Sequence, residues 1–157
     1  MREFIGGRYM FTFFNDFDIL SDEKITLKVC EKFQGNDVLL PFYYYDIYDN
    51  GTGERIGKIS IRIGHNYHSY YNGHIGYEID EPYRGSSYSY HGIRLVVAVA
   101  RAHQMKSLYL TCKVSNVASR KIIERTHATL QEVAKIPRDC FFWREGIEDY
   151  CIYLLRL

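Results

Sequence analysis

The sequence contains no long hydrophobic run and no cluster of basic residues. No apolar stretch approaches the ~20 residues of a membrane-spanning helix, and the N-terminus, MREFIGGRYMFTFF, lacks the layout of a signal peptide. Basic and acidic residues nearly balance, 20 against 19, which gives a formal net charge of +1. These absences argue against a membrane, and against nucleic acid, as a partner. We therefore expect a cytoplasmic protein.

Cysteine and histidine are few and scattered. The four cysteines form no CxxC pair, and the six histidines fall at no metal-ligand spacing, so we expect no metal site. Cys30, Cys112 and Cys151 lie within predicted strands, where a buried, reduced thiol is the expected state.

A chain of 157 residues suits a single domain, residues 1–157, with one hydrophobic core. No internal repeat, low-complexity tract or linker interrupts it. The fifteen tyrosines favour amphipathic sheet packing, and an aromatic acceptor pocket or a dimer surface is the alternative. Residues 1–24 are the least regular part, and their phenylalanines predict a strand or an aromatic plug before a turn at 15–18.

The period of hydrophobic residues predicts an antiparallel meander followed by a crossover. Alternating residues predict strands at 24–31, 42–48, 55–63 and 74–80, joined by a turn at 34–37, a hairpin at 49–53 and a polar loop at 64–73. Helical spacing predicts a mostly buried helix over 87–104, followed by a strand at 108–114. This crossover makes the strands 74–80 and 108–114 parallel. A further helix from Asn116 and strands at 128–136 and 148–157 complete an α/β (α+β) fold with a mixed, mostly antiparallel sheet and helices on its faces.

Small residues lie where the strand 74–80 passes into the long helix. The stretch reads Arg84-Gly85-Ser86-Ser87-Tyr88-Ser89. The first amides of a helix lack internal partners and carry partial positive charge, so small side chains there suit an anion such as a phosphate. Simple capping of the helix by serine is the alternative.

Three features in order, GYEI at 76–79, Arg84-Gly85 before a helix, and Asn116-x-x-Ser119 with Glu124, resemble the GNAT family of N-acetyltransferases. The resemblance covers roughly Ile25 to the C-terminus. It implies the acyl-CoA N-acyltransferase fold, with the parallel strands splayed apart to admit the thioester end of acetyl-CoA. It also implies a strand and two helices near the N-terminus. Because residues 1–24 leave little room for both helices, we expect an abbreviated acceptor entrance, completed by a second subunit in a homodimer.

The resemblance also implies the residues that bind acetyl-CoA, the co-substrate. They are Ile79, Arg84, Gly85, Ser86, Ser87, Tyr88, Ser89 and Asn116. Arg84 matches the first position of the family's acyl-CoA loop, while Ser87 and Ser89 replace its two small residues. Serine preserves the backbone donors, provided that neither position needs a positive φ. For Asn116, which the resemblance places on the pantetheine arm, helix capping alone is the alternative.

The family chemistry implies direct attack of a primary amine on the thioester in a ternary complex. A backbone N–H near Ile79 would stabilise the oxyanion, and Glu78 is the predicted general base, with His74 or a water relay as the second choice. A solvated or ion-paired surface group is the alternative for Glu78. Many members use a tyrosine to protonate the thiolate, but Ile123 stands at that position, so Ser119 is the predicted substitute. His127 replaces a glycine that turns left-handed.

The expected function is acetyl transfer from acetyl-CoA to a small-molecule or peptide amine. Two alternatives are a catalytically degenerate acyl-CoA binder with a regulatory role, and an interaction protein that retained the fold. The sequence does not identify the acceptor. Phe141, Phe142 and Trp143, between the last two strands, are expected to pack on their own domain or a dimer partner, and covering the acceptor pocket is the alternative.

Overall fold

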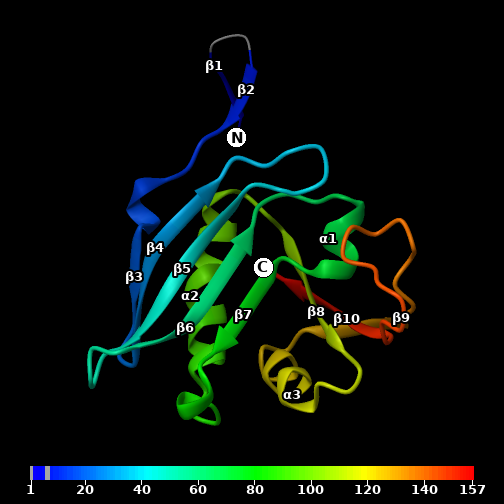
Figure 1. The fold of residues 1–157 in the computed structure, drawn as a ribbon. Helices are drawn as coiled ribbons and strands as arrows, with labels where there is room; N and C mark the ends of the chain where they lie inside the picture. The colour runs from blue at the N-terminus through cyan, green and yellow to red at the C-terminus, as the bar shows by residue number, and fades with distance from the viewer. Residues whose placement is uncertain (1, 6–7) are drawn as a thin grey trace.

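The computed structural model describes residues 2–5 and 8–157, with side chains from Met10 onward (Figure 1). Its strands are β1 (Arg2–Ile5), β2 (Arg8–Phe11), β3 (Ile19–Ser21), β4 (Ile25–Phe33), β5 (Phe42–Asp49), β6 (Arg55–Arg62), β7 (Ile75–Ile79), β8 (Ser107–Lys113), β9 (Thr129–Ala134) and β10 (Tyr150–Arg156). Its α-helices are α1 (Tyr67–Asn72), α2 (Tyr88–Ala102) and α3 (Val117–Arg125), and short 3-10 helices occupy Asn15–Phe17 and Glu81–Tyr83. None of the helices in the described part of the chain is long and apolar enough to span a membrane.

The strands form antiparallel sheets, and the predicted fold class is confirmed. One sheet has the order β3-β4-β5-β6-β7, a second has the order β8-β10-β9, and β1 pairs with β2 in a hairpin. The predicted meander is therefore correct. One feature differs from the sequence expectation: among the described strands, β7 and β8 share no ladder, so the predicted mixed sheet is divided into two sheets at this pair.

The core lies between α2 and the five-stranded sheet, with α2 behind the sheet in the view of Figure 1. Ile93, Val96 and Ala100 project from α2 toward Ile59 and Ile61 of β6, and all five are at most 1% exposed. Burial of each large aliphatic side chain contributes about 1.5–3 kcal/mol. The opposite face of β4–β7 is not covered by any helix that the structure describes (Figure 1).

Helix α1 contradicts the prediction of a polar loop over residues 64–73. Asn66 and Ser69 form a capping box, in which Asn66 Oδ1 accepts from the Ser69 amide at 2.8 Å and Ser69 Oγ accepts from the Asn66 amide at 3.0 Å. Two reciprocal caps offset the cost of nucleating a helix of six residues. The sequence prediction missed this Asn-x-x-Ser signal.

The N-terminal segment contains a hairpin and a 3-10 turn instead of two α-helices. The turn predicted at 15–18 is the 3-10 helix Asn15–Phe17. Phe14 stacks on His103, the C-cap residue of α2, with ring centroids 4.2 Å apart, and the Phe14 amide donates to the Tyr43 hydroxyl at 2.7 Å. Aromatic contacts therefore hold this segment against the core, in agreement with the predicted aromatic plug. The side chains of Phe4 and Tyr9 lie outside the described residues.

The cysteine prediction was correct for two strands and wrong for one. Cys112 and Cys151 are buried, free thiols, whereas Cys30 is exposed. The β4–β5 register shifts between Val29 and Glu31, and this bulge leaves Cys30 on the outer face.

Candidate functional site

Strands β7 and β8 meet at one point and then diverge. The His74 amide donates to the Tyr109 carbonyl at 2.8 Å, and the Tyr109 amide donates to His74 Nδ1 at 2.8 Å. From this junction the two strands spread apart toward the ends that precede α2 and α3 (Figure 1). The open end of this V-shaped gap is where the family resemblance implied a splay.

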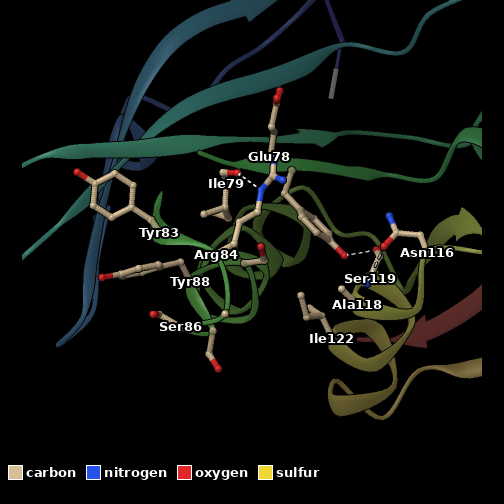
Figure 2. Close-up of a pocket in the computed structure, with 14 residues that line it drawn as sticks. Glu78, Ile79, Tyr83, Arg84, Ser86, Tyr88, Asn116, Ala118, Ser119 and Ile122 are labelled. Carbon is tan, nitrogen blue, oxygen red and sulfur yellow. Dashed lines mark hydrogen bonds between the residues drawn. The ribbon is translucent and has the colours of Figure 1, made fainter. Parts of the chain in front are cut away.

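A cleft of about 560 Å³ lies at this open end (Figure 2). The predicted cofactor contacts, the first-choice base and the predicted acid all line it: Glu78, Ile79, Arg84, Gly85, Ser86, Ser87, Tyr88, Ser89, Asn116 and Ser119. His74, the second-choice base, does not line the cleft. Tyr77, Tyr83, Ala118 and Ile122, which were not predicted, complete the lining. The fold thus brings three separate segments of the chain to one cavity.

The loop before α2 forms the lower wall of the cleft and presents its backbone. Gly85 has a φ of +87°, and a Cβ added there would meet nothing within 4 Å. Ser87, the N-cap of α2, has a φ of +64° and makes no side-chain capping bond. Serine was expected to be tolerated in this loop only where φ is not positive. Ser87 does not meet this condition, because a positive φ costs a non-glycine residue about 1–2 kcal/mol of conformational free energy. The first amides of α2 are left for an external acceptor.

Three cations from three segments surround this loop. Arg84 Nε donates to the Ile79 carbonyl at 2.9 Å, and Arg125 donates to Ser87 Oγ at 3.1 Å. Lys24, the residue before β4, contacts the Ser86 carbonyl, and its ammonium lies 4.8 Å from the centroid of the Tyr88 ring. Neither Lys24 nor Arg125 was predicted, because each lies far from the loop in sequence.

The backbone of β7 faces the cleft on the side away from β6. The Asp80 amide donates to the Ile56 carbonyl, and Glu78 lies opposite Lys58 in the ladder. Since alternate residues of an antiparallel strand bond to the same neighbour, the amide of Ile79 points away from β6, into the gap. This donor fits the predicted oxyanion contact and suits a pantetheine amide equally.

Asn116 and Ser119 open α3 on the other wall of the cleft. Asn116 Oδ1 accepts from the Ser119 amide at 3.1 Å, so the asparagine does cap the helix. Ser119 Oγ lies 2.5 Å from the Tyr77 hydroxyl. Burial, as the largest cause, raises the pKa of Tyr77, so this phenol stays protonated at neutral pH. Ile123 is 1% exposed and points into the core.

Glu78 and His74, the two predicted bases, have different environments. Glu78 is exposed, and Figure 2 shows its carboxylate directed away from Ser119 and Asn116. His74 is 0% exposed, accepts from the Tyr109 amide at Nδ1 and donates from Nε2 to the Gly64 carbonyl at 2.7 Å. Burial lowers the pKa of His74 to about 4. His74 is therefore a structural residue, and its proposed role as a base was wrong.

The aromatic loop between β9 and β10 packs near α1. Phe141 lies against His68, with ring centroids 5.4 Å apart, and Tyr67 donates to Asp139 at 2.7 Å. Phe142 contacts Tyr150. None of the three loop aromatics lines the cleft.

Asp22, Glu23 and His91 bring ligand-type atoms within 4.8 Å of one another, a grouping that the sequence did not predict. Asp22 pairs with His91 at 2.7 Å and also accepts from the amides of Lys24 and Ile25. Burial by itself would raise the pKa of Asp22, but these hydrogen bonds outweigh it and the pKa is lowered. These contacts explain the grouping as a hydrogen-bonded pair, Asp22 with His91, that ties the β3–β4 turn to α2.

Comparison with solved structures identifies several chains with a similar fold. The structure titled RimL, a ribosomal L7/L12 alpha-N-protein acetyltransferase in its apo form, gives a TM-score of 0.65 at 15% identity over 98% of both chains. The acetyltransferase from Salmonella typhimurium that modifies the N-terminal serine of ribosomal protein L7/L12 gives 0.58 at 23% identity over 74% of this chain. The microcin C7 self-immunity acetyltransferase MccE, in complex with acetyl-CoA and AMP, gives 0.56 at 20% identity over 74% of this chain.

This chain spans 64% of the Salmonella protein and 61% of the MccE chain, less than two thirds of each. Comparison with curated protein sequences gave no match. The model of the acetyltransferase (GNAT) domain matches residues 11–129, a range that includes β3 to α3 and every residue of the cleft. The chain therefore belongs to the GNAT family of acetyltransferases.

Proposed function

We propose that the protein transfers the acetyl group of acetyl-CoA to a primary amine by direct attack in a ternary complex. This proposal depends on the cleft that lies where β7 and β8 diverge. The first amides of α2, the amide of Ile79 and the hydroxyls of Tyr77 and Ser119 all lie at this cleft. Acetyl-CoA would supply an activated thioester.

The donor fits the groups that line the cleft. The loop Gly85–Ser89 and the N-terminus of α2 would hold the pyrophosphate, with Arg84 and Lys24 adding positive charge. Asn116 would hold the pantetheine arm. As negative charge develops on the thioester carbonyl oxygen, the Ile79 amide would donate to it from a fixed position.

The acceptor amine would approach from the open face of the sheet. Glu78 projects toward this face, away from Ser119 (Figure 2). A proton could therefore be removed from the amine on one side of β7 and supplied to the leaving thiolate on the other. An ammonium group must lose a proton before it attacks, and Glu78 would accept it directly or through water. Because the named relatives include enzymes that act on ribosomal protein L7/L12, peptide N-termini are the first acceptors to test, followed by small amines.

The departing thiolate would receive its proton from Ser119. Ser119 Oγ is hydrogen-bonded to Tyr77, a residue that the sequence analysis did not assign to the site. The buried phenol can both orient the Ser119 hydroxyl and restore its proton. A thiol titrates near ~8.5, so the thiolate of CoA is a tolerable leaving group near neutral pH, and a hydrogen bond from a hydroxyl is sufficient help for its departure.

The proposal is tested by calorimetric titration with acetyl-CoA, with desulfo-CoA and ATP as controls. We expect micromolar affinity for the CoA forms and none for ATP. Release of free thiol in the presence of candidate peptides and amines then measures turnover. The absence of binding at millimolar acetyl-CoA would overturn the proposal and favour an interaction protein.

A second candidate is an acyl-CoA binder without turnover. The left-handed Ser87 and the buried Ile123, which stands at the family's tyrosine position, favour it. This candidate predicts acetyl-CoA binding without thiol release for any amine.

We further propose that residues 1–157 act as one domain and assemble as a homodimer in the cytoplasm. The edge strand β9 supports the dimer, because its Leu130 and Val133 are 45% and 52% exposed and its far edge has no partner among the described strands. Light scattering should give twice the mass of 18.5 kDa, and Val133→Lys should reduce it to that of one chain. A monomeric wild-type protein would contradict the dimer.

A further inference from the structure

A second cleft of about 330 Å³ lies beside the first, between α2, α3 and the end of β10. Four arginines line it: Arg94, Arg101, Arg125 and Arg156. Among the side chains that the structure describes, no carboxylate lies within ion-pair distance of any of the four. A protein with a net charge of only +1 thus concentrates unpaired positive charge in one small cleft.

Arg125 stands at the border between this arginine cleft and the loop at the start of α2. Its guanidinium donates to Ser87 Oγ at 3.1 Å, and Ser87 lines the first cleft. The guanidinium carbon also lies 3.9 Å from the centroid of the Tyr90 ring, while that of Arg94 lies 5.8 Å from the same centroid. The aromatic ring and the hydroxyl therefore hold one guanidinium beside the proposed pyrophosphate site.

We propose that Arg125 binds the 3′-phosphate of CoA at the mouth of the arginine cleft. This assignment rests on the proposed function. The phosphate is a monoester with a charge of about −1.5 to −2 at neutral pH, and it is attached to the ribose that follows the pyrophosphate. A planar guanidinium matches two phosphate oxygens at once, which an ammonium cannot do.

The test compares CoA with 3′-dephospho-CoA, which lacks only this phosphate, by titration calorimetry of the full chain. Wild-type protein should bind CoA about tenfold more tightly, the effect of one charge-assisted contact. Arg125→Gln should remove most of this difference and leave the affinity for 3′-dephospho-CoA within twofold. Lys121→Gln is the matched control, because Lys121 is exposed on the same helix and lines neither cleft.

Equal affinity of the wild type for the two ligands would overturn the assignment, as would an equal loss for both ligands in Arg125→Gln. Failure of both ligands to bind the wild type would overturn the proposed function itself. If Arg125→Gln does not fold, Arg125→Lys is used in its place. This variant should retain part of the preference for CoA over 3′-dephospho-CoA, and full retention of that preference would contradict the role of the guanidinium.

Discussion

The hydroxyl oxygens of Tyr77 and Ser119 lie 2.5 Å apart and connect β7 to α3 across the cleft. Tyr77 lies in β7, and Ser119 lies in the helix that Asn116 caps. In the mechanism that we propose, the two hydroxyls act as one proton-donating unit, in which Ser119 would donate to the leaving thiolate and Tyr77 would orient the Ser119 hydroxyl.

Substitution of the two hydroxyls should give non-additive losses of turnover. Ser119→Ala should lower kcat at least tenfold, and Tyr77→Phe should lower it less, because Ser119 remains. The double variant should equal Ser119→Ala, since the phenol acts through the serine. The KM for acetyl-CoA should stay within twofold. Turnover of the wild type, the two single variants and the double variant is measured by thiol release, with Tyr48→Phe as a control outside the cleft. Additive losses would show that the two hydroxyls do not act together.

Glu78→Gln should slow turnover at least tenfold while the affinity for acetyl-CoA changes little. The amide cannot accept the ammonium proton, but it preserves the size of the side chain. Glu81→Gln is the matched control, because Glu81 is exposed, close in sequence and absent from the cleft lining. Steady-state rates and calorimetry provide the two readouts, and unaltered turnover would remove Glu78 from the mechanism.

Ser87→Gly should stabilise the fold by about 0.5–1 kcal/mol, because glycine adopts a φ of +64° without the steric cost that serine pays. CoA affinity should be unchanged or tighter. Ser87→Ala, which removes the hydroxyl and keeps the strain, should show no such stabilisation. Urea unfolding and calorimetry distinguish these effects. A clear loss of CoA affinity in both variants would show that the hydroxyl contributes to binding, either directly or by holding Arg125.

Stability should decline as the pH falls from 6.5 to 4, in part because of His74. The pKa of this histidine is about 4 in the fold, where burial disfavours its charge, and about 6.5 when unfolded, so in this range the unfolded chain binds more protons. The contribution is complete above pH 6.5 and is lost as the pH approaches 4, on the order of 3 kcal/mol in total.

His74→Gln should be less stable at pH 7.5 but should show a shallower decline toward pH 4. His103, whose pKa burial also lowers to about 4, will maintain some slope in the variant. His127→Asn is the control, because His127 is exposed and asparagine tolerates its φ of +66°. Urea unfolding across this pH range is the measurement, and parallel curves for wild type and His74→Gln would refute the role of His74.

The sequence by itself determined the features that repeat over a few residues. Alternation in Ile75–Ile79, helical spacing in α2 and the Asn116 cap each reflect a period or a bond within one element, so they can be read locally. The left-handed conformation at His127, where φ is +66°, was implied by the family resemblance, because a glycine usually occupies that position. Local patterns therefore predicted the order of the elements and the anion-binding loop at 84–89, and the resemblance supplied the roles of Glu78, Ile79, Asn116 and Ser119.

Only the tertiary structure decided what these elements bring together. Lys24 reaches Ser86 over 62 residues, Tyr77 reaches Ser119 over 42, and Arg125 reaches Ser87 over 38. Because side chains alternate along a strand, the sequence places His74 and Glu78 on the same face of the sheet. The contact with Tyr109 nevertheless buries His74, whereas Glu78 is exposed. Such contacts depend on how β7, β8 and the two helices pack, and no periodicity within one segment encodes the distance to another.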